Sequence, residues 1–512
     1  MSDWTDGYVA DIAYTHGYYA ELNPLRSRFA LLKAGYAFPA AGAACELGFG
    51  QGISINAHAS ATTVEWHGTD FNPTQAGYAQ GLGAATGARV HLHDEAFAEF
   101  CSRSDLPQFD FIGLHGIWSW ISDENRHVIV DFLRRKLKVG GVLYISYNTQ
   151  PGWAAMVPVR DLMAQYADLM GMPGAGIVSR IDGAIGFAQK VIASGARFGQ
   201  ANPQIAQRLA ALKTQDRNYI AHEYFNSDWL PMSFAKMHGW LDEAKLGYAC
   251  SAHLVDHVDA VNLTAEQQEI IHAIPDRMFK ESVRDFMVNS QFRRDYWVKG
   301  LRPLPALQRT ELLRQQCFVL AMDKSKITLT VTGALGEGNM APHLYLPVIA
   351  LLADGQVHSL REMERALEGT GGSFDTLLEV VAILIAKGSI HPAQDAAAIA
   401  AAAPSARAFN RRLCEQARDS SAVTVLASPV TGGGIPVPRL EQLMLLARAD
   451  GADNPEDWAR SVLRIMSMQG QRIHKAGKPL ETPEQELASL VEVAIELRDT
   501  RLFMLDALQV KC

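Results

Sequence analysis

The first 150 residues alternate short apolar runs with stretches that favour helices. The runs expected to form strands are residues 43–47, 64–69, 90–92, 109–114 and 142–147. A helix is expected between the last two runs, over residues 122–136. Strands that alternate with helices are typical of parallel βαβ units. The sequence therefore predicts an α/β sheet that binds its ligand at the carboxyl ends of the strands.

Composition narrows the class of protein. The chain has 512 residues, a net charge of −8 and 48% hydrophobic residues, which suits about three folded domains and excludes dominant disorder. The acidic balance argues against a protein that mainly binds nucleic acid. The sequence shows no 18-residue apolar run, no signal pattern, no C-x-x-C pair and no metal-ligand spacing. We expect a cytoplasmic protein with no transmembrane segment and no metal.

Aromatic residues are distributed unevenly along the chain. Only six of the 20 Phe, 14 Tyr and 9 Trp residues follow residue 300, which indicates a boundary near residues 300–303 and chemistry on its N-terminal side. Four domains are predicted: residues 1–255 with a helical insertion at about 153–217, a regulatory or linking segment at 256–335, a module at 336–395, and a C-terminal domain at 405–512.

A glycine-rich turn follows the first predicted strand. Glu46 is followed by Gly48, Gly50 and Gly52, so a ligand can approach the backbone closely. The dinucleotide fingerprint would need glycine at position 53, where Ile53 stands, and no phosphate-binding lysine follows the last glycine. The pattern favours a ligand without phosphates. The acid at position 46 favours a positively charged one, such as S-adenosylmethionine.

Acidic residues also follow the second and third predicted strands. Asp70 suits the hydroxyl groups of a ribose. Its alternative role is the N-cap of a helix that begins near Pro73. Asp94 and Glu95 suit the exocyclic amine of an adenine, or form a solvated acidic loop.

The fourth and fifth predicted strands end in aromatic and polar residues. His115 precedes Trp118 and Trp120, and is a candidate proton acceptor, a wall of the site or a structural histidine. Tyr147 and Asn148 are expected at the same edge of the sheet, or in a turn before a proline.

Together these motifs resemble bacterial class I S-adenosylmethionine-dependent methyltransferases that carry a methyltransferase regulatory domain. That group includes lysine methyltransferases of outer-membrane proteins. The resemblance covers about residues 8–300. Residues 284–286 and 292–295 resemble the end of the regulatory segment.

The resemblance implies S-adenosylmethionine as cofactor and a set of site residues. The predicted cofactor-binding residues are Glu46, Gly48, Gly50, Gly52, Asp70, Phe71, Asp94, Glu95, His115 and Gly116. The catalytic candidates are His115 and Tyr147 as bases and Tyr14, Trp118 and Trp120 as aromatic walls. The candidate substrate contacts, for which core roles are the alternative, are Tyr18, Tyr19, Asn148, His222, Tyr224 and Trp229.

The expected function is methyl transfer to lysine side chains of a protein. Two alternatives remain open: an O- or N-methyltransferase for a polysaccharide or small metabolite, and a non-catalytic scaffold with a cofactor fold. The expected partners are a protein or glycan acceptor and a second copy of the chain in a homodimer. Residues 336–395 resemble a winged helix, with helices at 344–352, 360–367 and 374–386 before a strand at 389–391. The third helix is acidic and apolar, which favours a packing or partner-protein module over nucleic-acid binding.

Overall fold

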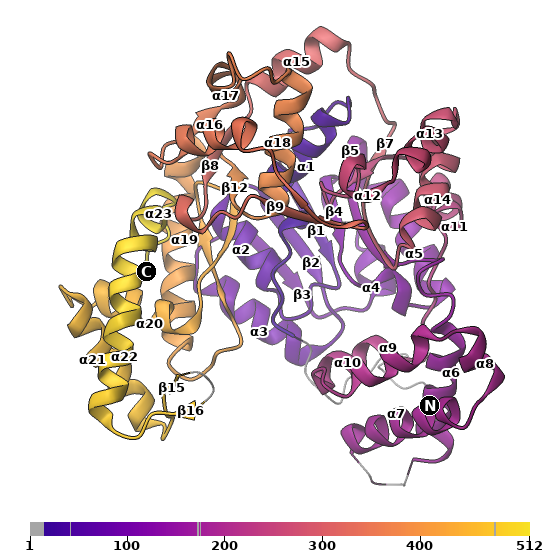
Figure 1. The fold of residues 1–512 in the computed structure, drawn as a ribbon, viewed down its shortest axis with the longest axis horizontal. Coiled ribbons are helices and arrows are strands. Elements are labelled where there is room, and N and C mark those ends of the chain that lie inside the picture. Colours follow the sequence, from indigo (N-terminus) through magenta and orange to yellow (C-terminus); the bar gives the residue numbers. More distant parts are fainter. Residues whose placement is uncertain (1–14, 41, 172–173, 175, 476–477) are drawn as a thin grey trace.

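A seven-stranded sheet organises the N-terminal part of the chain (Figure 1). The computed structural model describes residues 15–40, 42–171, 174, 176–475 and 478–512. The strand order is β3-β2-β1-β4-β5-β7-β6, with β7 antiparallel to both of its neighbours. The strands are β1 (Ala43–Leu47), β2 (Glu65–Thr69), β3 (Val90–His93), β4 (Phe109–Leu114), β5 (Leu137–Asn148), β6 (Leu246–Ser251) and β7 (Phe292–Lys299).

The α/β prediction is confirmed, because helices alternate with the first five strands. These helices are α1 (Pro24–Lys33), α2 (Ile53–Ala61), α3 (Pro73–Ala84), α4 (Phe97–Ser102) and α5 (Asp123–Lys136). All nine residues of α2 are buried. Its small side chains let it pack closely between the sheet and a helix of the C-terminal region, α19 (Ala396–Gln416).

A helical insertion follows β5, as the sequence indicated. Its helices are α6 (Val157–Leu169), α7 (Ile177–Ala193), α8 (Arg197–Ala201), α9 (Gln204–Leu212) and α10 (Arg217–Tyr224). They form their own apolar core around Trp153 and Trp229, whose rings meet edge to face at 5.2 Å. Figure 1 shows this unit gathered at one end of the molecule, near the lower edge of the sheet.

Strand β7 lies beyond the expected limit of the catalytic fold at residue 255. Its sequence carries Arg293, Arg294 and Asp295, and these charges hide the apolar alternation of a strand. In the structure β7 pairs with β5 from Val142↔Val298 to Asn148↔Phe292, and with β6 on its other side. The sheet therefore ends at Lys299, next to the boundary that the aromatic distribution indicated. The helices between β6 and β7 are α12 (Asp259–Asn262), α13 (Ala265–Ala273) and α14 (Arg277–Val288), and α11 (Phe234–Asp242) precedes β6.

The buried Arg293 side chain joins β7 to its surroundings. Its guanidinium donates to Asp285 at 2.7 Å and Glu281 at 2.9 Å, both on α14, and to Asp295 at 3.0 Å. Asp295 also accepts a hydrogen bond from Tyr147 on β5 at 3.0 Å. Burial raises the pKa of Asp285 to about 7, so one carboxyl of the cluster keeps its proton readily. The network makes a charged strand compatible with the interior of the protein.

The remaining chain forms small sheets and helices. A three-stranded sheet, β11-β8-β12, packs with three helices that lie close to the predicted ones. These elements are β8 (Cys317–Leu320), α16 (Pro342–Leu352), β11 (His358–Ser359), α17 (Leu360–Ala366), α18 (Phe374–Ala386) and β12 (Ile390–Pro392).

The C-terminal helices lie on the opposite side of the molecule from the insertion (Figure 1). They are α20 (Arg439–Ala449), α21 (Pro455–Met468), α22 (Pro483–Glu496) and α23 (Leu502–Ala507). The other short elements are α15 (Ala306–Arg314), β9 (Thr330–Gly333), β10 (Gly336–Asn339), β13 (Val425–Ser428), β14 (Gly433–Pro436), β15 (His474–Lys475) and β16 (Lys478–Pro479). Among the described residues, no helix combines the length and apolar character needed to cross a bilayer.

We expect Arg293→Ala to lower the free energy of unfolding by about 3–5 kcal/mol, because removing one partner leaves buried carboxylates without their counter-charge. Urea denaturation measures the change. Arg134→Ala is the control, since Arg134 pairs with Asp131 on the exposed face of α5, and such pairs contribute about 1 kcal/mol or less. Equal effects of the two substitutions would contradict a stabilising role of the cluster.

Candidate active site

A cavity of about 390 Å³ lies at the carboxyl ends of β1, β2 and β4. Parallel α/β sheets bind ligands at this edge, where the strand ends and the following loops meet. The residues that line it are Thr15, Gly17, Tyr19, Glu46, Gly48, Phe49, Gly50, Gln51, Asp70, Phe71, Gln75, Glu95, Ala96, Phe97, Ala98, His115, Gly116, Ile117, Trp120, Ile121, Ser122, Glu124, Asn125, Val128 and Asp228.

Carboxylates dominate the charge of this cavity. Five of the described lining residues are Asp or Glu, and none of those described is Lys or Arg. Glu46 is 3% exposed, and its Oε2 atom has no hydrogen-bond partner in the described part of the chain. Burial and the nearby Asp70 charge raise the pKa of Glu46 well above its usual value. The cavity therefore favours a positively charged ligand.

Asp70 holds the glycine-rich turn against β2. Its carboxylate accepts hydrogen bonds from the backbone N–H of Gly50 at 2.8 Å and of Asn72 at 3.0 Å. Burial nevertheless raises its pKa to about 7. The N-cap of α3 is Asn72 and not Asp70, so the capping alternative does not describe this carboxylate. Carboxylate oxygens can accept further hydrogen bonds, so Asp70 can still contact a ligand.

The turn itself needs glycine. Gly48, Gly50 and Gly52 have φ angles of +70°, +57° and +68°, in the left-handed region. A Cβ atom at position 48 would lie 2.4 Å from Ile117 Cδ1, and one at position 52 would lie 2.4 Å from the Ala79 Cβ atom. The missing side chains keep this side of the cavity open and let α2 begin at Ile53.

His115 forms an aromatic stack at the other side of the cavity. Its ring lies 3.4 Å from the ring of Tyr19, and its Nδ1 atom is 2.8 Å from Tyr144 Oη. Burial lowers the pKa of His115 to about 4, so the imidazole is neutral near pH 7. A group with this pKa is a weak proton acceptor, which favours a role as a hydrogen-bonding wall over that of a general base.

The structure brings many of the predicted site residues together at this cavity. They are Glu46, Gly48, Gly50, Asp70, Phe71, Glu95, His115, Gly116, Trp120 and Tyr19. Gly52 lies just behind the lining as the N-cap of α2. Asp94 is exposed and outside the lining, and Glu95 pairs with Arg103 at 2.6 Å. Tyr14 lies outside the described residues.

Three predictions at the ends of β4 and β5 are not supported by the geometry. Trp118 is fully buried and donates to Met232 Sδ, and Asn148 is 3% exposed within β5. Tyr147 is fully buried and donates to Asp295 on the far face of the sheet. Because neighbouring side chains of a strand point to opposite faces, Tyr144 and Ser146 face His115 and Gly116 instead. Trp118 and Tyr147 therefore lie outside the lining of the cavity, and their side chains are held in the protein interior.

The other candidate substrate contacts also have packing roles. Tyr18 is half-buried and accepts a hydrogen bond from Gly434 N at 2.7 Å, which connects it to the C-terminal region. Tyr224 and Trp229 belong to the apolar core of the insertion, and His222 is 2% exposed beside them in α10. Their alternative role in the core is the one that the structure favours.

Several residues that line the cavity were not predicted from the sequence. Asp228 reaches the cavity from the segment after α10, and Gln51 and Gln75 come from the turn and from α3. Phe97, Ile117, Ile121 and Val128 give the cavity an apolar side. Only the position of Gln51 within the glycine turn could have indicated its role, because the others reach the cavity through tertiary packing.

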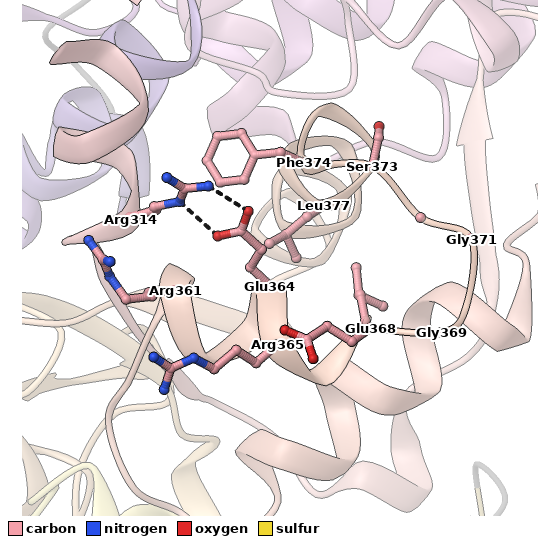
Figure 2. A pocket seen from close by; sticks show the side chains of 12 residues that line it. Arg314, Arg361, Glu364, Arg365, Glu368, Gly369, Gly371, Ser373, Phe374 and Leu377 are labelled. Atoms are coloured by element: carbon pink, nitrogen blue, oxygen red, sulfur yellow. Dashed lines mark hydrogen bonds and ion pairs between the residues drawn. The ribbon is translucent and has the colours of Figure 1, made fainter. Parts of the chain in front are cut away.

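A second cavity, of about 790 Å³, lies beside α17 and α18. Its charged lining residues are Arg314, Arg361, Arg365, Glu364 and Glu368. Arg314 pairs with Glu364 at 2.8 Å, and Arg361 pairs with Glu311 at 2.8 Å. Figure 2 shows the two hydrogen bonds between Arg314 and Glu364. Basic and acidic side chains therefore both line this cavity, whereas the described lining of the first one has no Lys or Arg.

Comparisons with known proteins identify the fold of the chain. Residues 216–299 match the model of a predicted methyltransferase regulatory domain. The protein sll1526 of Synechocystis sp. is 39% identical over 510 residues, which cover 99% of each chain. The chain belongs to the same family as sll1526. The structure of PKMT2 from Rickettsia typhi in complex with AdoHcy covers 97% of this chain and 99% of that one, with a TM-score of 0.68 and 17% identity. A second structure of PKMT2 covers 94% with a TM-score of 0.66.

These matches show an S-adenosylmethionine-dependent methyltransferase fold that carries a regulatory domain. The matched regulatory residues include α10, α11, α14 and the strands β6 and β7. They also include Asp228, which lines the cavity. The segment that matches the regulatory-domain model is therefore part of the seven-stranded sheet and contributes to the candidate active site.

We expect Gly48→Ala to lower the melting temperature, because a Cβ atom there strains a positive φ angle and collides with Ile117. The destabilisation should be about 1 kcal/mol or more. Gly81→Ala is the matched control, since Gly81 lies within α3 and a Cβ atom there meets nothing within 4 Å. Alanine is favoured in helices, so the control should be neutral or stabilising. Unchanged stability of Gly48→Ala would contradict the steric argument.

We expect Asp70 to make the ligand-free protein less stable as pH rises from about 4 to about 7. Its folded pKa of about 7 lies above the ordinary value of 3.8, so the folded state binds more protons in this window. Asp70→Asn removes this titration, together with the part of the Glu46 pKa shift that the Asp70 charge causes. Thermal melts from pH 4 to pH 8 should show the stability of the wild type falling relative to the variant. Parallel profiles would mean that the carboxyl ionises normally.

Proposed function

We propose that the chain transfers methyl groups from S-adenosylmethionine to lysine side chains of a protein. The observation that carries this proposal is the cavity at the strand ends, with five carboxylates and no described Lys or Arg in its lining. S-adenosylmethionine carries an ammonium and a sulfonium group. Such a ligand suits acidic walls, whereas a dinucleotide would bring phosphates into repulsion with them.

The residues of the cavity fit this cofactor. The unpartnered Glu46 Oε2 atom suits a cationic hydrogen-bond donor, and the open turn at Gly48 and Gly50 gives room beside it. Asp70 and Glu95 suit hydroxyl and amine donors, and Phe97 and Ile117 offer apolar contact to a flat ring. When bound, the cofactor supplies an activated methyl group on its sulfonium.

The protein's own residues would align the acceptor and exclude water. Tyr19, His115 and Trp120 form an aromatic side of the cavity, which suits a cationic amine through cation–π contact. Aromatic walls also keep water away from the reacting groups. A lysine must lose a proton before it accepts a methyl group, and a desolvated amine does so more readily because burial lowers its pKa.

A protein acceptor is supported by similarity along the whole chain. One solved structure that matches nearly the full length is that of PKMT2 from Rickettsia typhi, whose name denotes a protein lysine methyltransferase. The regulatory segment adds Asp228 to a cavity sized for a small molecule, and the insertion and the C-terminal region extend the chain well beyond that cavity, which suits a large acceptor that presents one side chain. A polysaccharide or small-metabolite acceptor remains the second candidate, since the cofactor side of the cavity would be the same.

We propose that the region around α16, α17 and α18 is a winged-helix-like packing module. Eight residues of α18 are buried, among them Leu377, Val381 and Leu384. A helix that reads DNA must present one face to the groove. The burial of α18 supports a role in packing over a role in nucleic-acid binding.

We expect the purified chain to bind S-adenosylmethionine, and Glu46→Gln to weaken binding about 10–100-fold, the equivalent of about 1.5–3 kcal/mol for a hydrogen bond to a charged group. Isothermal calorimetry measures both. Glu99→Gln is the control, because Glu99 is exposed on α4 and outside the cavity. Absence of binding by the wild type would favour a non-catalytic scaffold.

The acceptor class is tested with labelled S-adenosylmethionine and a cell-envelope extract. We expect label in protein bands, with mass spectrometry placing one to three added methyl groups on lysine. Label confined to a glycan or small-molecule fraction would overturn the protein assignment and leave the methyltransferase assignment in place.

A further inference from the structure

A cluster of two histidines and one glutamate lies on the edge of the sheet, outside the candidate active site. Glu65 and His67 are on β2, and His91 is on the edge strand β3. His67 and His91 are direct partners in the parallel register. Glu65 is two residues before His67, so its side chain lies on the same face. The three side chains meet only because the strands pair, since 24 residues separate His67 from His91.

The geometry of the cluster is that of a set of metal ligands. Glu65 Oε1 lies 3.1 Å from His91 Nε2 and 3.6 Å from His67 Nε2. One ligand atom from each residue lies within 4.8 Å of the others. Ligands at about 2.0–2.1 Å from a tetrahedral Zn²⁺ are about 3.3 Å apart. The two observed distances, 3.1 Å and 3.6 Å, lie on either side of this value. Small rotations of the exposed His91 ring can bring the ligand atoms to the required spacing.

The buried member of the cluster supplies a second, independent observation. His67 is 9% exposed, and both of its ring nitrogens lack a hydrogen-bond partner in the described part of the chain. Buried imidazole nitrogens normally have a partner. The Nε2 atom of His67 lies 3.6 Å from Glu65 Oε1, beyond hydrogen-bond distance, so an ion bound between them would give this ring nitrogen a partner.

Charge around the cluster is also compatible with a cation. Arg89 pairs with Glu65 through Oε2, which leaves Oε1 facing the two imidazoles. The Arg89 side chain is 66% exposed and can turn into solvent. His91 is 51% exposed, which gives an ion a route from solvent, whereas His67 closes the inner side.

We propose that Glu65, His67 and His91 bind a divalent first-row transition-metal ion such as Zn²⁺. Imidazole nitrogen and carboxylate oxygen are ligands that Zn²⁺ accepts, and three protein ligands leave a position for water. The ion would join the edge strand β3 to β2. Asp70 follows β2 and Glu95 follows β3, so the ion would stabilise the strands that carry the acidic wall of the cavity. The proposal does not depend on the proposed function.

The test uses the full chain and ZnCl₂. We expect one Zn²⁺ to bind per chain in competition with a chromophoric chelator, and the melting temperature to rise with Zn²⁺ concentration. His67→Gln and His91→Gln should each weaken Zn²⁺ binding at least tenfold. His474→Gln, which changes an exposed histidine elsewhere, should leave binding unchanged. His91 is largely exposed, so its variant should fold even if that of His67 does not.

The substitution Arg89→Gln distinguishes a metal site from a cluster that only stabilises the fold. Removing the neighbouring positive charge should strengthen Zn²⁺ binding several-fold if Glu65 is a ligand. Equal Zn²⁺ affinity of the wild type and His91→Gln, or no Zn²⁺-dependent change in melting temperature, would overturn the proposal. Calorimetry with S-adenosylmethionine provides the separate readout, since loss of a surface metal should leave the cofactor cavity intact.

Discussion

The buried charge of Arg293 is the constraint on which the arrangement of the active site depends. Its guanidinium is fixed by carboxylates from α14 and from β7 itself. A buried ion is expensive to desolvate and tolerates little displacement, because its partners must stay in place. β7 is thereby fixed between β5 and β6, where it completes the mixed sheet.

The opposite face of β7 controls the cavity. Tyr296 donates to the carbonyl oxygen of Glu21 at 2.6 Å, and Arg294 pairs with the Glu21 side chain at 3.1 Å. Glu21 lies in the short 3-10 helix η1 (Ala20–Leu22), directly after Tyr19. Tyr19 in turn stacks on His115. One strand of the regulatory segment thus connects a buried ion network on one face with an aromatic wall of the site on the other.

Charge distinguishes the two cavities described above. The cavity near α18 is lined by arginines and glutamates together, and Arg314 pairs there with Glu364. At the strand ends, Glu46 and Asp70 are buried without a cation, and burial raises the pKa of both. Such carboxyls cost folding free energy when ionised. The cost is offset when a cationic ligand binds, which explains why acids are concentrated at this edge.

Local sequence determined the first five strands, the glycine turn and the acids at strand ends, because short apolar runs and the spacing of glycines are properties of neighbouring residues. Glu46, Gly48, Asp70 and His115 were found in this way. Tertiary structure decided what depends on distant segments. The pleat of β5 directs Tyr144 toward His115 and Tyr147 away from it. The charged residues of β7 hide its strand pattern in the sequence, and the strand is stable in the interior only because those charges are paired there. Asp228 reaches the cavity only through the folding of the insertion that precedes it. Glu65, His67 and His91 likewise meet through strand pairing, which no spacing along the chain reveals.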